Sequence, residues 1–73
     1  MEQTYVGEWK DGNSDGFGKI VFKERYGVYV GEFRRGRKHG WGVEEQPGKS
    51  LYVGEFELDK FQGQGTLTLT EEG

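Results

Sequence analysis

The sequence predicts an all-β fold, an elongated single-layer antiparallel sheet built from three consecutive β-hairpin repeats. The first observation is a motif that occurs three times, Tyr-Val-Gly-Glu followed by an aromatic residue, starting at Tyr5, Tyr29 and Tyr52. The starts are 24 and 23 residues apart, and a fixed period in this range is typical of stacked repeat arrays. The second observation is composition, since 14 of the 73 residues are Gly and 15% are aromatic. Glycine at this level disfavours helices and suits turns and strands.

The period divides the chain into units at residues 5–28, 29–51 and 52–73, which together form a single array within one domain, residues 1–73. Three units are the usual minimum for a stable stack. Because the units fill nearly the whole sequence, we expect it to be a segment of a larger protein.

The first unit begins with an alternating stretch in which Tyr5, Gly7 and Trp9 share one face. A period of two indicates a strand with two distinct faces. Residues 11–14, Asp-Gly-Asn-Ser, predict a four-residue turn. A second strand then runs from Asp15 through Lys23, so the unit is expected to be an antiparallel hairpin.

We expect Lys10 to pair with Asp15, and further pairs then follow, Trp9 with Gly16, Gly7 with Gly18, and Tyr5 with Ile20. This register places the rings over glycines, which recovers stability that glycine costs a strand. The opposite face would carry Val6, Glu8, Lys10, Phe17, Lys19, Val21 and Lys23.

The second unit departs from the first in its turn and in its return strand. Its predicted turn is Arg35-Gly36-Arg37-Lys38, and Pro47-Gly48 ends the return strand. Glu44 and Gln46 stand where the first unit has apolar residues, so this strand is less apolar on the ring face.

The third unit keeps paired glycines at Gly63 and Gly65 and has Asp59 in the turn position that the other units give to Gly. Aspartate tolerates the left-handed conformation better than most residues, so the turn is expected to persist. The strand that follows alternates Leu67 and Leu69 with Thr66, Thr68 and Thr70.

Composition excludes several classes of function. The chain has no Cys, which removes disulfide and thiolate chemistry and favours an intracellular setting. No apolar run approaches the roughly 20 residues needed to span a bilayer, and no signal-peptide pattern follows Met1. The net charge of -3 argues against generic nucleic-acid binding.

The repeated pattern resembles the MORN (membrane occupation and recognition nexus) repeat. The first two units carry the resemblance most fully, through Tyr5, Gly7, Glu8, Trp9, Gly12, Gly16 and Gly18, and through Tyr29, Gly31, Glu32, Phe33, Gly36, Gly40 and Gly42. The third unit contributes Tyr52, Gly54, Phe56, Gly63 and Gly65. The resemblance implies a row of hairpins in one twisted sheet with a groove. For function, it implies a binding module and little more, because such repeats occur in many unrelated proteins.

Catalysis and cofactor binding are not expected. His39 is the only His and has no visible acid or base partner. One His and scattered carboxylates give no metal-ligand spacing. The Gly-x-Gly pairs lack the helix, the third Gly and the Lys-Ser/Thr of phosphate-binding loops, so we expect a non-enzyme without a cofactor.

Two surfaces are candidate binding sites. Basic residues in and beside the second turn could attract anionic phospholipid, or could simply be a solvated turn: Arg34, Arg35, Arg37 and Lys38. Aromatic residues form the other candidate. Rows made of Tyr5, Tyr29 and Tyr52 and of Trp9, Phe33 and Phe56 are expected to form the core. A single-layer sheet leaves rings exposed, so we expect partner contacts at Phe17, Tyr29, Phe33 and Trp41.

The function that the sequence favours is therefore a non-catalytic protein–protein interaction scaffold that binds a partner peptide, helix or domain on an aromatic sheet face. Association with an anionic, phosphoinositide-type membrane through residues 34–39 is the alternative. Self-association is a further expectation, because both ends of an array present open strand edges. The second unit is the expected working unit, since it lies between the other two and holds the basic turn.

Overall fold

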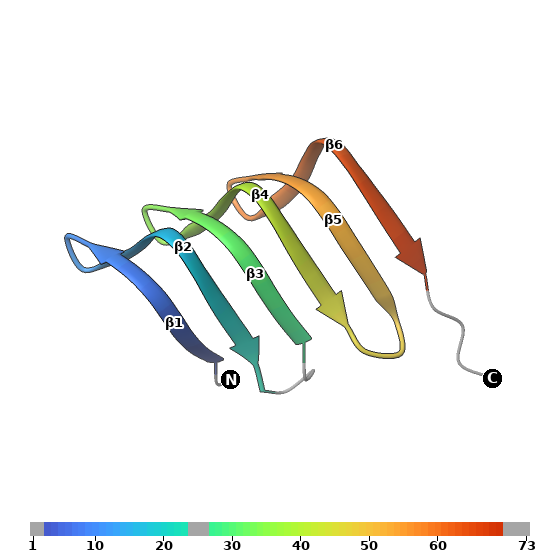
Figure 1. The fold of residues 1–73 in the computed structure, drawn as a ribbon, viewed down its shortest axis with the longest axis horizontal. Coiled ribbons are helices and arrows are strands. Elements are labelled where there is room, and N and C mark those ends of the chain that lie inside the picture. Colours follow the sequence, from blue (N-terminus) through green and yellow to red (C-terminus); the bar gives the residue numbers. More distant parts are fainter. Residues whose placement is uncertain (1–2, 24–26, 70–73) are drawn as a thin grey trace.

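The computed structural model describes residues 3–23 and 27–69, so Thr70, assigned above to the last strand, lies outside the described residues. The described residues form six strands: β1 (Gln3–Lys10), β2 (Asn13–Phe22), β3 (Gly27–Arg34), β4 (Arg37–Gln46), β5 (Ser50–Glu57) and β6 (Lys60–Leu69). They make one antiparallel sheet in sequence order. Figure 1 shows the strands side by side, with β1 and β6 at the two ends. The predicted fold class is confirmed.

The core lies on one face of this sheet, here called the ring face. Its buried side chains are Tyr29, Phe33, Tyr52 and Phe56, with Tyr5, Ile20 and Phe22 packed against them. The sheet is long and thin, with extents of 45 × 28 × 15 Å. The core lies on one face because side chains alternate between the two faces of a strand. In each repeat, the tyrosine and the aromatic residue four positions later therefore point to the same side.

The hairpin tips are two-residue turns rather than the predicted four-residue turns. The turns are Asp11-Gly12, Arg35-Gly36 and Leu58-Asp59, and all six residues have positive φ, between 52° and 82°. Two positive φ angles in succession match the right-handed twist of the flanking strands. Asn13, Ser14, Arg37 and Lys38 therefore belong to strands. Asp59 does adopt the left-handed conformation, at a φ of 70°.

The predicted register holds away from the tip and is wrong beside it. Gly7 faces Gly18 as expected, but Trp9 faces Ser14 instead of Gly16. A β-bulge between these pairs takes up two extra residues of β2. An even number of extra residues leaves each side chain on its predicted face. The same shift occurs in the second and third hairpins.

Backbone hydrogen bonds join one hairpin tip to the next. Gly36 N donates to Ser14 O at 2.9 Å, and Asp59 N donates to Lys38 O at 3.2 Å. At the other end of the strands, β4 ends at Gln46 and Pro47-Gly48 forms the turn into β5, as predicted. These bonds fix the spacing of the tips, where the candidate binding residues lie.

Candidate binding site

A continuous series of aromatic contacts crosses the ring face. Tyr5 contacts Trp9 of its own hairpin, with ring centroids 4.8 Å apart, and Phe33 of the next hairpin, at 5.1 Å. Tyr29 likewise contacts Phe33 and Phe56, both at 5.0 Å. All four contacts are edge-to-face, a geometry that adds about 0.5–1.5 kcal/mol per pair beyond area burial.

This packing corrects half of the predicted partner-binding set. Tyr29 is 0% exposed and Phe33 is 4% exposed, so neither ring can meet a partner at the surface. They are core residues because their rings pack against each other, and each also packs against one ring of a neighbouring hairpin. Of the four residues predicted to contact a partner, only Phe17 and Trp41 are therefore exposed.

Each repeat tyrosine lies over a glycine of its return strand, as the sequence predicted. A Cβ on Gly18 would overlap the ring of Tyr5, and a Cβ on Gly42 would overlap that of Tyr29. Each tyrosine hydroxyl also donates to the backbone carbonyl three residues later, at 2.7, 2.9 and 3.0 Å in the three repeats. The Tyr-x-Gly-Glu spacing is thus a packing and hydrogen-bonding unit.

The glutamate of the motif has a role that the sequence analysis missed. The Glu8 carboxylate accepts a hydrogen bond from Phe17 N at 2.8 Å, and Glu55 accepts one from Gln64 N at 3.1 Å. The Glu32 carboxylate lies against Gly40 in the same way. All three carboxylates fill the bulges, and those of Glu8 and Glu55 accept a backbone N–H there. The signal in the sequence was the return of Glu at this position in all three units.

Lys38 is separated from the other basic residues. Its side chain lies on the ring face, with Nζ 2.6 Å from Glu44 Oε1 and 5.1 Å from the centroid of the Phe22 ring. The two charged side chains are only 14% and 15% exposed. The Lys38 ammonium group therefore lies on the ring face, apart from the exposed arginines, and is not placed for the predicted lipid contact.

The opposite face, here called the valine face, carries an exposed apolar patch. Its valines lie in one line across the sheet and are 38–67% exposed: Val6, Val30, Val43 and Val53. Phe17 and Trp41 stand two residues closer to the hairpin tips and are 64% and 51% exposed. They occupy equivalent positions two strands apart, which corresponds to a separation of about 10 Å.

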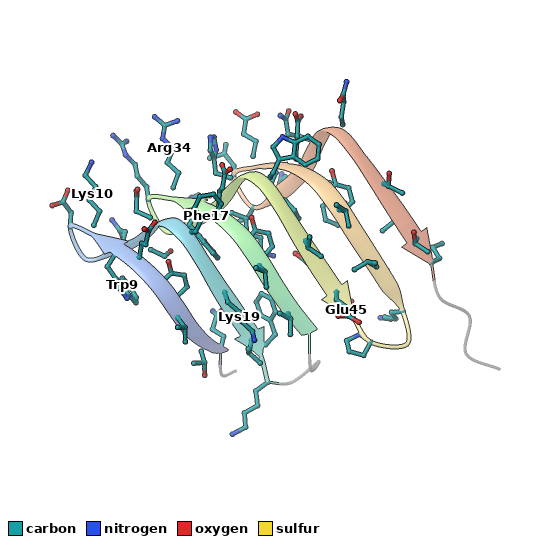
Figure 2. All side chains as sticks on the ribbon, in the orientation of Figure 1. Trp9, Lys10, Phe17, Lys19, Arg34 and Glu45 are labelled. Carbon is teal, nitrogen blue, oxygen red and sulfur yellow. The ribbon has the colours of Figure 1, made fainter. Side chains whose placement is uncertain are left out.

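Exposed arginines border this patch at the second hairpin tip. Arg34, Arg35 and Arg37 are all exposed. Arg34, Arg35 and His39 line a shallow hollow with Phe17, and His39 also lines an adjoining hollow with Trp41. Figure 2 shows Lys10 and Arg34 at the tips on the side away from Trp9. The basic tip and the two surface aromatics therefore form one continuous candidate site.

Metal coordination and membrane spanning find no support in the described part of the chain. Residues 3–23 and 27–69 contain no group of three or more His, Cys, Asp or Glu placed to hold a metal ion. Over the same residues, no helix is long and apolar enough to cross a membrane.

A model of the MORN repeat family matches residues 5–24, 29–49 and 52–71. These matches cover most of the chain, so the protein belongs to the MORN repeat family. MORN repeats are generally associated with protein or membrane-lipid interaction. A search of the curated proteins gives no match to this chain.

Proposed function

We propose that this chain is a non-catalytic scaffold segment whose valine face binds a segment of another protein. The proposal is carried by the exposure of Phe17 and Trp41, 64% and 51%, on a face that also presents four valines. Clustered exposed apolar side chains are typical of protein-binding surfaces. Aromatic side chains at the centre of such surfaces commonly supply most of the binding energy.

The geometry also suggests the chemistry of the partner. Two anchors about 10 Å apart suit apolar partner residues spaced by three in an extended segment or by seven in a helix. Lys10, Arg34 and Arg37 lie on the tip side of the aromatics, so acidic partner residues would find complementary charge there. We therefore expect an apolar segment bordered by Asp or Glu.

A displayed library of short random peptides, selected on the 73-residue chain, would test this proposal. A selected peptide is expected to lose at least tenfold in affinity for Phe17→Ala or Trp41→Ala, measured by titration calorimetry. Trp9→Ala is the matched control, because Trp9 is 61% exposed on the ring face. The proposal fails if Trp9→Ala weakens binding as much as Trp41→Ala does, with all variants folded by circular dichroism.

Association with anionic phospholipid is the second candidate, favoured by the three exposed arginines at one hairpin tip. Each Lys or Arg near an anionic surface contributes about 1 kcal/mol, and salt screens the attraction. Sedimentation with phosphatidylserine vesicles should weaken for Arg35→Glu and for Arg37→Glu. Lys60→Glu is the control, because Lys60 occupies the position of Arg37 in the third hairpin. Equal pelleting of all variants would rule out the basic tip as the contact.

A further inference from the structure

Carboxylates stand in the same row of the valine face as the two exposed aromatics. Phe17 on β2 lies directly opposite Glu32 on β3, and Trp41 on β4 lies directly opposite Glu55 on β5. Directly opposed residues point to the same face of an antiparallel pair, with Cβ atoms about 4.5–5.5 Å apart. Because β3 lies between β2 and β4, Glu32 is the side chain that stands between Phe17 and Trp41.

A carboxylate between the two aromatics would work against the proposed partner. That partner is an apolar segment bordered by Asp or Glu, and a negative charge beneath it would repel its acidic residues. Burial of the unpaired charge under the apolar part of the segment would cost further free energy. The position of the Glu32 carboxylate therefore decides whether the partner can use the space between Phe17 and Trp41.

The structure places the Glu32 carboxylate away from this space, in the bulge of β4. Glu32 is half-buried, and a Cβ on Gly40 would overlap its Oε1 atom, so the carboxylate fits there only because residue 40 is a glycine. The other two motif glutamates fill the bulges of their own hairpins in the same way and accept a backbone N–H there. The bulge thus holds the side chain against the backbone of the next strand.

We propose that Glu32 is a positioning residue of the partner site, an inference that rests on the proposed function of the valine face. With its carboxylate seated at Gly40, the space between Phe17 and Trp41 is open to an apolar side chain of the partner. The seated carboxylate also leaves Arg34, which is exposed two residues farther along the same face of β3, to meet an acidic residue of the partner.

The length of the glutamate side chain is what lets it reach the bulge. Aspartate at position 32 keeps the charge but is one methylene shorter, so its carboxylate would stay between the two aromatics. Glutamine keeps the length and an oxygen acceptor and loses only the charge. These two substitutions therefore separate the position of the side chain from its charge.

Titration calorimetry tests the proposal with a peptide selected on the chain and first shown to depend on Phe17 and Trp41. Glu32→Gln should bind within about threefold of the wild type, and Glu32→Asp at least about tenfold more weakly. Glu55→Asp is the matched control. It makes the same change in the third bulge, outside the space between the two aromatics, and should cost less than about threefold. Circular dichroism checks that each variant is folded.

Gly40→Ala tests the same arrangement from the other side of the bulge. The added methyl group displaces the Glu32 carboxylate, so binding should weaken at least about tenfold. Glu32→Ala in the same chain should restore affinity to within about threefold of the wild type, because the displaced charge is gone. If Gly40→Ala does not fold, the comparison of Glu32→Asp with Glu32→Gln decides alone.

The outcomes separate this inference from the proposed function. Equal affinities of Glu32→Asp and Glu32→Gln overturn the positioning role alone, and so does an equal loss in Glu55→Asp. Selected peptides that bind without Phe17 and Trp41 overturn the proposed function, and the positioning role fails with it.

Discussion

Lys38 Nζ lies 2.6 Å from Glu44 Oε1 on the ring face, between aromatic rings of all three repeats. The other repeats hold Ser14 with Ile20 and Phe61 with Leu67 at these two positions. The middle repeat thus has an ion pair, largely shielded from water, where the first repeat has a serine and an isoleucine and the third has two apolar residues. Gln46 Nε2 donates to the second oxygen of Glu44 at 3.5 Å and completes this polar group.

The first prediction concerns this pair. Lys38→Ser and Glu44→Ile should each cost about 3 kcal/mol of unfolding free energy, because each leaves a shielded charge without its partner. The double variant copies the first repeat and should lie within about 1 kcal/mol of the wild type. Urea unfolding, followed by circular dichroism, measures the unfolding free energy of the wild type, the two single variants and the double variant. Arg37→Ser, at an exposed position, is the control, and additive single costs would contradict the prediction.

The second prediction separates core from surface aromatics. Phe33→Ala should lower the unfolding free energy by about 3–5 kcal/mol, because it leaves a cavity between two tyrosines. Phe17→Ala removes the same side chain from the valine face and should cost less than about 1 kcal/mol. Thermal or urea unfolding of the pair is the measurement. Similar losses in the two variants would mean that Phe17 also belongs to the core.

The third prediction concerns the glutamate in the bulge. Glu55→Ala should cost about 1.5–3 kcal/mol, because Gln64 N loses a charged acceptor. Glu57→Ala, two residues along the same strand and exposed, should change stability by less than about 0.5 kcal/mol. Hydrogen exchange at the Gln64 amide should accelerate in Glu55→Ala alone. An unchanged exchange rate would show that this hydrogen bond does not persist in solution.

The fourth prediction concerns alkaline pH. Burial, and then the charge of Glu32, raise the pKa of the Tyr29 phenol well above its ordinary value. Stability from this group is fully present below the unfolded pKa of about 10. This stability is lost as the pH rises above that value, because the Tyr29 phenol ionises in the unfolded chain while it stays protonated in the folded one. The expected slope is up to about 1.4 kcal/mol per pH unit.

Comparison of two phenylalanine variants tests this assignment. Tyr29→Phe should flatten the loss of stability above pH about 10, at a cost of about 1 kcal/mol at neutral pH from the hydrogen bond to Glu32 O. Tyr5→Phe should change the slope less, since Tyr5 is only partly buried. Identical alkaline slopes in the wild type and Tyr29→Phe would show that another group causes the loss.

Much of the fold could be read from the sequence, because its signals are local and repeated. The 24- and 23-residue spacings fix three hairpins, and the period of two fixes which side chains share a face. The pairing of Gly7 with Gly18 was predicted from a four-residue turn, and it is confirmed although the turn has two residues. The turn length could not be read from the sequence, because a two-residue turn with a bulge and a four-residue turn place the far ends of the strands in the same register.

The sequence by itself therefore determined the repeat, the two faces and the packing of each tyrosine over its glycine. The tertiary structure alone decided which aromatics are buried and where the basic residues point. Phe33 is buried because its ring packs against Tyr5 of the preceding hairpin on the ring face, whereas Phe17 lies on the opposite face and is exposed. The Lys38 side chain lies apart from the neighbouring arginines because it packs among Glu44, Phe22 and Phe56, which come from three different repeats. The ring contacts join Lys38 to residues of the first and third repeats, and no local pattern encodes them.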